Sequence, residues 1–139
     1  MSDMPKLIVL RTQPEHLRAV VQHHKHALNG KLAAQPGDIL LICKTGSGLV
    51  CHAMRFQRQR HDTAGETEKH WGKHWKYIID ANDCCELNRP FDPKDERITE
   101  VSRKDYGPGG SFFYVLKEDA EEFRKKGLLR PLLPPSDLG

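Results

Sequence analysis

Two apolar runs separated by a tight turn constrain the fold of this chain more than any other feature. Residues 38–44 (DILLICK) and residues 49–56 (LVCHAMRF) are both short and mostly apolar. The segment between them, Thr45-Gly46-Ser47-Gly48, has the composition of a tight turn. This arrangement predicts two buried strands that pair with each other as a β-hairpin.

The rest of the chain predicts three more strands and two helices. An amphipathic helix is predicted over residues 15–28 by the spacing i, i+3, i+4, i+7 and i+11 of Leu17, Val20, Val21, His24 and Leu28, of which all but His24 are apolar. A charged helix is expected over residues 117–126. Strands are expected over residues 6–10 (KLIVL), 75–80 and 111–116, whereas residues 57–72 and 81–94 are expected to be loop or irregular structure.

Strand follows strand in this order without regular intervening helices, which argues against a doubly wound parallel sheet. The expected fold class is α+β, with a small, strongly curved mixed β-sheet or partly open β-barrel and peripheral helices. A chain of 139 residues fits one domain. We expect that domain to span residues 1–130, followed by a Pro-rich tail or linker over residues 131–139.

Charge is modest overall but locally concentrated. The formal net charge of +3 and the mean hydropathy of −0.65 do not by themselves point to nucleic acid. Between residues 52 and 76, however, six Lys or Arg side chains face only three Asp or Glu. A phosphate-facing surface needs such a local excess.

Several classes of protein are disfavoured by the sequence. No apolar run approaches the ~20 residues that a membrane-spanning helix needs, and the first residues do not resemble a signal peptide. We therefore expect a cytoplasmic protein with no membrane partner and with four reduced cysteines. His70 and His74 have the spacing of metal ligands, but Gly72 lies between them, so we expect no metal and no cofactor. We assign no catalytic residue, because the sequence contains no nucleophile-elbow serine or recognisable nuclease motif.

Both tryptophans lie within five residues of each other, among cations. Trp71 and Trp75 fall in the segment KHWGKHWK, just before an expected strand. Large aromatic rings beside Lys and His at a loop–strand junction suit a flat ligand next to a phosphate, for which a nucleobase is the obvious candidate. The alternation of Trp75 with Tyr77 and Ile79 leaves open that Trp75 simply faces the core.

The ordered set of motifs resembles the PUA-like superfamily, and within it the EVE-type domains. The motifs are the initial strand KLIVL, the hairpin PGDILLICKTGSGLVCHAMRF, the pattern Trp75-x-Tyr77-x-Ile79, the pair Leu87 and Pro90, and the segment SFFYVLKEDAEEF. The resemblance covers residues 5–127. It implies the curved sheet described above.

YTH domains of the same superfamily give a closer local comparison. They carry a tryptophan shortly before the strand that follows the long loop, where it forms one wall of an aromatic cage around a methylated adenine. Trp71 matches that position. Their second cage tryptophan lies between the first strand and the hairpin, whereas residues 11–37 of this chain contain no Trp, Tyr or Phe. The resemblance therefore leans to the EVE-type domains, which are similar to readers of modified cytosines.

The function that the resemblance implies is a nucleic-acid-binding module that reads a modified base. The base would be methylated or hydroxymethylated cytosine, or N6-methyladenine, flipped into an aromatic pocket. DNA is favoured and RNA is left open. The module would be the targeting domain of a modification-dependent restriction system, with a nuclease as an attached or separate partner. The alternatives are an ASCH-like nuclease or hydrolase, and an RNA-binding domain indifferent to base modification.

The candidate site residues follow from this expectation. The base-binding pocket is expected to comprise Trp71, Trp75, Tyr106, Arg11, Thr12, Thr45 and Ser47. The phosphate-binding cations are expected to be Lys44, Arg58, Arg60, Lys73 and Arg103. The run that holds Arg58 and Arg60 could equally be a solvated surface.

Overall fold

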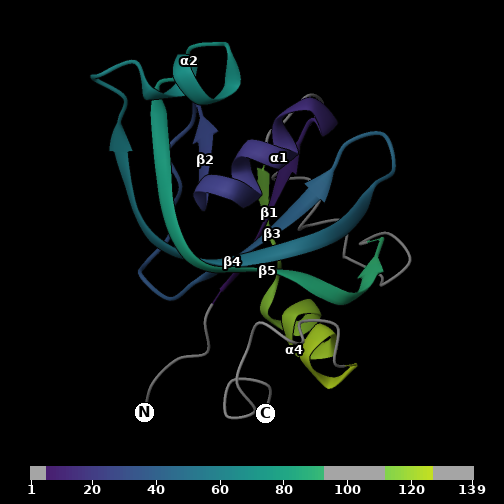
Figure 1. Cartoon of the computed structure of the whole chain (residues 1–139). Coiled ribbons are helices and arrows are strands. Elements are labelled where there is room, and N and C mark those ends of the chain that lie inside the picture. Colours follow the sequence, from purple (N-terminus) through teal and green to yellow (C-terminus); the bar gives the residue numbers. More distant parts are fainter. Residues whose placement is uncertain (1–5, 93–111, 127–139) are drawn as a thin grey trace.

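The computed structural model describes residues 6–92 and 112–126 (Figure 1). The described elements, in chain order, are β1 (Leu7–Thr12), α1 (Pro14–His23), β2 (Lys25–Leu28), β3 (Ile39–Lys44), β4 (Leu49–His61), α2 (Glu66–Trp71), β5 (Tyr77–Phe91), β6 (Phe112–Tyr114) and α4 (Lys117–Lys125). The strands form one sheet in the order β2-β5-β4-β3-β1-β6.

The sheet is mixed. β1 runs parallel to β3, and every other neighbouring pair is antiparallel. β3 and β4 form the expected hairpin, in which the N–H of Gly48 donates to the carbonyl of Lys44 across the turn. The α+β class with a small, open and curved mixed sheet is thus confirmed.

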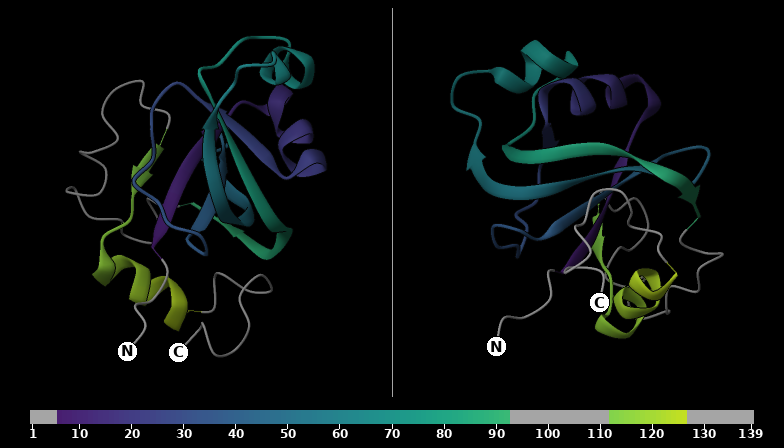
Figure 2. Two further views of the ribbon diagram at one scale, coloured as in Figure 1. Left: turned by 90° about the vertical axis from the view of Figure 1, so that its left-hand side faces the viewer. Right: turned by 60° about the horizontal axis from the view of Figure 1, so that its bottom comes forward.

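Both faces of the sheet are covered by helices. α1 and α2 lie over one face and α4 over the other (Figures 1 and 2). Side chains alternate along β1 in agreement with this arrangement, since Leu7 and Val9 belong to the core on the α4 face, whereas Ile8 and Leu10 belong to the core on the α1 face. Strands buried on both faces read as the continuous apolar runs seen in the sequence.

The sheet is strongly curved. β4 and β5 are long strands whose pairing shifts register at three places, and the β3–β4 pair shifts once more. Such irregularities bend strands and increase their twist. β1 and β2 are separated by three strands in the sheet order, and yet Thr12 Oγ1 of β1 lies 2.8 Å from His26 Nε2 of β2. The curvature therefore brings two distant strands together around a hollow.

Three expectations about secondary structure were wrong. The helix expected over residues 15–28 ends at His23, because His24 adopts a left-handed conformation (φ 55°) and its N–H donates to the carbonyl of Val20. Residues 25–28 instead pair with β5 as strand β2. The loop expected over residues 57–72 holds the end of β4 and all of α2, and the irregular segment expected over residues 81–94 is strand to Phe91.

The remaining expectations about organisation are partly outside the described residues. The Pro-rich segment 131–139 lies beyond residue 126 and is not described. Among residues 6–92 and 112–126, no helix combines the length and the apolar character that crossing a bilayer requires.

Candidate functional site

A pocket of about 250 Å³ opens on the face of the sheet that α1 and α2 cover. It is bounded by the end of β1, the inner side of α1, β2 and the segment between α2 and β5. The residues that line it are Arg11, Thr12, Gln13, His16, Val20, His26, Ala27, Leu28, Asn29, Trp71, Lys73 and Trp75. The pocket therefore brings together four residues of the expected base-binding pocket, namely Trp71, Trp75, Arg11 and Thr12. It also includes Lys73 from the expected phosphate-binding set.

The two tryptophans form a corner in the pocket wall. Trp71 is the last residue of α2 and is only 7% exposed, whereas Trp75 is half-buried. Their rings meet edge to face, with centroids 6.2 Å apart and planes at 78°. The imidazole of His16 meets the Trp75 ring edge-on at 5.4 Å, and Lys73 Nζ lies 5.4 Å from the centroid of the same ring. This geometry gives Trp75 an electron-rich face beside a cation.

A chain of hydrogen bonds holds Trp75 in place. The backbone N–H of Trp75 donates to Thr67 Oγ1 across 3.0 Å, and that hydroxyl donates to Asp62 Oδ2 across 2.6 Å. The Asp62 carboxylate also accepts the backbone N–H groups of Glu66 and Thr67, at the start of α2. The hydroxyl of Thr67 and these N–H groups lower the pKa of Asp62 to about 2. Asp62 therefore stabilises α2 and, through Thr67, the segment that carries Trp75.

The floor of the pocket contains a buried polar pair. Thr12 is 3% exposed and His26 is 5% exposed. Thr12 Oγ1 lies 2.8 Å from His26 Nε2, and His26 Nδ1 lies 3.0 Å from the carbonyl oxygen of Ala27. Burial lowers the pKa of His26 to about 4, against the opposing effect of the Ala27 hydrogen bond, so the ring is neutral at pH 7.

The rim of the pocket is polar and positively charged. Arg11, Gln13, Asn29 and Lys73 are exposed there. Asn29 Oδ1 accepts the N–H of Lys76 across 3.0 Å, which ties β2 to the segment before β5. Among the described residues that line the pocket, none is Asp or Glu. The site therefore suits a neutral flat group attached to an anionic one.

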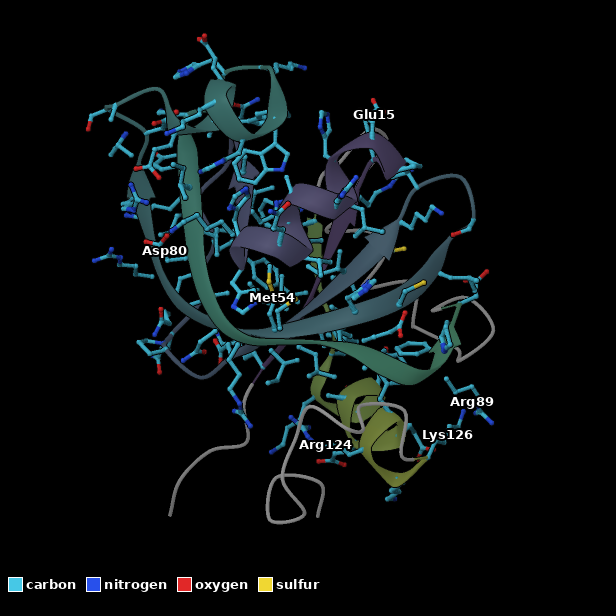
Figure 3. All side chains as sticks on the ribbon, viewed as in Figure 1. Glu15, Met54, Asp80, Arg89, Arg124 and Lys126 are labelled. Atoms are coloured by element: carbon cyan, nitrogen blue, oxygen red, sulfur yellow. The ribbon has the colours of Figure 1, made fainter. Side chains whose placement is uncertain are left out.

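Arg58 and Arg60 lie elsewhere and have an intramolecular partner. Asp80, labelled in Figure 3, lies on β5. Its carboxylate accepts hydrogen bonds from Arg58 Nε at 2.6 Å, Arg60 Nε at 2.8 Å and Lys25 Nζ at 2.5 Å. Arg60 also makes a two-pronged contact with Glu66 at 2.9 and 3.1 Å. Burial opposes ionisation of Asp80, but hydrogen bonds from the three cations outweigh it and hold the pKa of the carboxyl well below its ordinary value. This cluster joins β2, β4, β5 and α2.

The hairpin turn does not contribute to the described pocket. The N–H of Thr45 donates to the carbonyl of Thr12, and Ser47 Oγ donates to the carbonyl of Lys44. Lys44 lines a separate, shallower hollow on the other side of α1, together with Leu17, Arg18 and His52. Thr45, Ser47 and Lys44 are therefore not among the residues that line the pocket with the tryptophans. Tyr106 and Arg103 fall outside the described residues.

Four polar residues of the pocket lining were not foreseen from the sequence: Gln13, His16, His26 and Asn29. His26 was expected on a helix, where its side chain would not reach the first strand. The sequence did contain a signal for Asn29, because an Asn-Gly pair often follows a secondary-structure element. Among the described residues, no group of three or more His, Cys, Asp or Glu is placed to hold a metal ion.

Comparison with known proteins finds similar folds only. No family model and no curated protein matches the sequence. The YTH domain of Zygosaccharomyces rouxii MRB1, solved with N6-methyladenosine RNA, has a TM-score of 0.64 at 13% identity over 91% of this chain and 89% of that one. ASCH from Zymomonas mobilis has a TM-score of 0.61 at 13% identity, over 86% and 94% of the two chains.

A third similar structure is protein Atu2648 from Agrobacterium tumefaciens. Its TM-score is 0.57 at 17% identity, and the match covers 94% of this chain and 99% of that one. At these identities the likeness concerns the fold alone. It agrees with the α+β fold with a small, curved mixed sheet that the motifs predict, whereas membership of the PUA-like superfamily and the EVE-type assignment stay predictions.

Proposed function

We propose that this chain binds nucleic acid and takes one modified base, extruded from its stack, into the pocket beside Trp71 and Trp75. The observation that carries the proposal is the edge-to-face pair of indoles in a small pocket with a cationic rim. A YTH domain of similar fold was solved with N6-methyladenosine RNA, which supports a ligand of this class.

The size of the pocket fits a single base. Sites for drug-sized ligands usually measure ~300–1,000 Å³, whereas this pocket measures about 250 Å³. Stacking of a base on an aromatic ring supplies ~1–3 kcal/mol, and extrusion of that base costs a few kcal/mol. Contacts between the phosphates and the rim, from Lys73 and Arg11, would supply the rest.

Trp75 is the better candidate for the stacking surface. It is half-buried and lines the pocket, whereas Trp71 is almost wholly buried and belongs to the core cluster beneath α1. In this proposal Trp71 forms the back of the pocket and fixes the orientation of Trp75. Arg58 and Arg60 serve the fold through Asp80, so Lys73 takes over the principal phosphate contact.

A binding panel tests the proposal. Short DNA and RNA oligonucleotides that differ in one base, plain or modified, are titrated at two salt concentrations. We expect one modified base to bind more tightly than its plain counterpart, and Trp75→Ala to remove that preference. Lys73→Ala should weaken binding to all sequences and reduce the salt slope by about one ion. Lys69→Ala, an exposed cation of α2 outside the pocket lining, is the matched control. Equal binding of plain and modified strands by the native protein would refute the proposal.

A hydrolase of the ASCH kind is the second candidate, because a hydroxyl and an imidazole lie within hydrogen-bond distance in the pocket. Thr12 Oγ1 and His26 Nε2 have the spacing of a nucleophile and its base. The low pKa of His26 makes its imidazole a weak base, however, and its other nitrogen contacts a carbonyl rather than a carboxylate. Incubation of the pure protein with oligonucleotides and a divalent metal, followed by chromatography, separates the two. Cleavage that Thr12→Val abolishes would favour the hydrolase.

The restriction role and the nuclease partner remain proposals that rest on the resemblance of the sequence motifs. A preference for DNA over RNA has the same standing, and the oligonucleotide panel tests it directly.

A further inference from the structure

His26 decides whether the pocket floor offers a ligand a hydrogen-bond donor or an acceptor, although His26 itself need not touch the ligand. The carbonyl oxygen of Ala27 can only accept a hydrogen bond, so His26 Nδ1, 3.0 Å away, must carry the ring proton. In a neutral imidazole the other nitrogen is then an acceptor. Because the pKa of His26 is lowered to about 4, the neutral form is the one present at pH 7.

The protonation state of His26 determines the direction of the hydrogen bond that the Thr12 hydroxyl makes. His26 Nε2 lies 2.8 Å from Thr12 Oγ1, and as an acceptor it takes the hydroxyl proton. A hydroxyl has one proton and two lone pairs, so the proton of Thr12 is committed to His26 and only lone pairs remain for a ligand. Thr12 has the same strand parity as Ile8 and Leu10, whose side chains lie on the face that bears the pocket.

Nothing else on the threonine competes for this hydroxyl among the contacts of the described residues. The backbone carbonyl of Thr12 accepts from the N–H of Thr45, so the main chain at this point is held by the hairpin turn. Threonine is also stiff about χ1. The hydroxyl oxygen is therefore a fixed acceptor in the buried floor of the pocket.

We propose that Thr12, oriented by His26, selects bases that present an N–H donor to the pocket floor, which means an exocyclic amine that retains at least one hydrogen. This inference rests on the proposed function and deepens it. Adenine or cytosine with one methyl group on the amine keeps such a donor, as does cytosine methylated on carbon. A doubly methylated amine has lost it and would leave the buried acceptor unpaired. His26 is a positioning residue, and Thr12 is the residue that contacts the base.

The binding test uses pairs of oligonucleotides that differ by one methyl group. One pair carries N6-methyladenine or N6,N6-dimethyladenine at a single position, and the other carries N4-methylcytosine or N4,N4-dimethylcytosine. We expect the native protein to bind the singly methylated strand of one pair roughly tenfold or more tightly than its partner, because a buried hydrogen-bonding group discriminates strongly against an analogue that cannot pair with it. Thr12→Val, which keeps the shape of the side chain, should reduce the ratio to near unity, and Thr12→Ser should preserve it.

The outcomes separate this inference from the proposed function. A ratio that is unchanged in Thr12→Val would mean that the extra methyl group is rejected by shape, and would overturn the role of Thr12 while the reader function stands. Equal binding of both strands by the native protein would do the same. If no modified strand binds better than its plain counterpart, the proposed function fails and the inference fails with it.

A spectroscopic measurement tests the premise without any ligand. The nitrogen chemical shifts of His26 in the ¹⁵N-labelled native protein should show a protonated Nδ1 and an unprotonated Nε2 at pH 7. A protonated Nε2 would reverse the polarity of Thr12 and overturn the inference. This measurement remains decisive if Thr12→Val does not fold.

Discussion

Thr67 Oγ1 accepts the backbone N–H of Trp75 across 3.0 Å and connects the tryptophan to the start of α2. The same hydroxyl donates its proton to Asp62. One fully buried side chain, that of Thr67, thus links the cap of a short helix to the segment that carries the half-buried indole of Trp75. A six-residue helix is too short to be stable alone, so the position of the pocket wall depends on these tertiary bonds.

Replacement of Thr67 by Val should loosen this wall. The variant leaves the N–H of Trp75 without its acceptor and removes one donor from Asp62, a loss we put at ~1–3 kcal/mol in the free energy of unfolding. We also expect faster hydrogen exchange at the Trp75 amide and weaker binding of the preferred oligonucleotide. The measurements are urea denaturation, exchange followed by NMR, and titration. Thr63→Val, at an exposed threonine in the segment just before α2, is the control. Identical exchange rates in the two variants would show that the bond does not hold the wall.

Replacement of Trp71 and replacement of Trp75 should have different effects, the first mainly on stability and the second mainly on binding. Trp71→Ala removes a nearly buried ring from the core and should cost ~3–5 kcal/mol in the free energy of unfolding. Trp75→Ala should cost clearly less, because its ring is half-buried, but it should remove the preference for the modified base. Denaturation curves and binding titrations of both variants test this division. The assignment of roles would be reversed if Trp75→Ala unfolded the protein while Trp71→Ala lost only the preference.

The hairpin of β3 and β4 could be predicted from the sequence, whereas the full length of β5 could not. The hairpin and the buried strands were predictable, because continuous apolar runs bounded by turn residues report local structure directly. The path of β5 was not, since its continuation past Asp80 depends on pairing with β4 through three register shifts. The polar and apolar residues of this continuation do not alternate regularly, so the sequence does not indicate a strand there.

The site shows the same limit. The proximity of Trp71 and Trp75 was evident from their spacing, and Thr12 was expected in the base-binding pocket. The partner of Thr12 was not, because His26 follows the left-handed turn at His24 and reaches β1 only through the curvature of the whole sheet. Likewise, Arg58 and Arg60 were predicted to bind phosphate, because nothing in the sequence indicated that both would form ion pairs with Asp80.

Neutralisation of Asp80 should destabilise the fold. Asp80→Asn leaves Lys25, Arg58 and Arg60 close together without their common carboxylate, in a place where the Asp80 side chain is 7% exposed. Removal of one partner from a buried ionic cluster is strongly destabilising, and partial exposure of the three cations reduces the effect to roughly 2–3 kcal/mol. Urea denaturation of this variant is compared with that of Glu121→Gln, an exposed carboxylate of α4. A loss no larger than that of the control would contradict a stabilising role for the cluster.

The pH dependence of stability should reveal the buried imidazole. The pKa of His26 falls from 6.5 in the unfolded chain to about 4 in the folded protein, so between these values the unfolded chain binds more protons. The free energy of unfolding must therefore decrease as the pH falls from about 6.5 to about 4, by up to ~3 kcal/mol from this residue. His70, whose pKa is also lowered, acts in the same direction.

Carboxylates affect mainly the acid end of this window, because the stability that comes from the lowered pKa values of Asp62, Glu66 and Asp80 is lost chiefly below their ordinary values of 3.8 for Asp and 4.5 for Glu. The measurement is the urea midpoint at pH 7, 6, 5 and 4 for the native protein and for His26→Gln. We expect a flatter profile in the variant, whereas His61→Gln, at an exposed position, should retain the native slope. Parallel profiles for the native protein and His26→Gln would mean that folding does not lower the pKa of His26, so the imidazole would be protonated, and the acceptor at the pocket floor lost, as the pH falls below about 6.5.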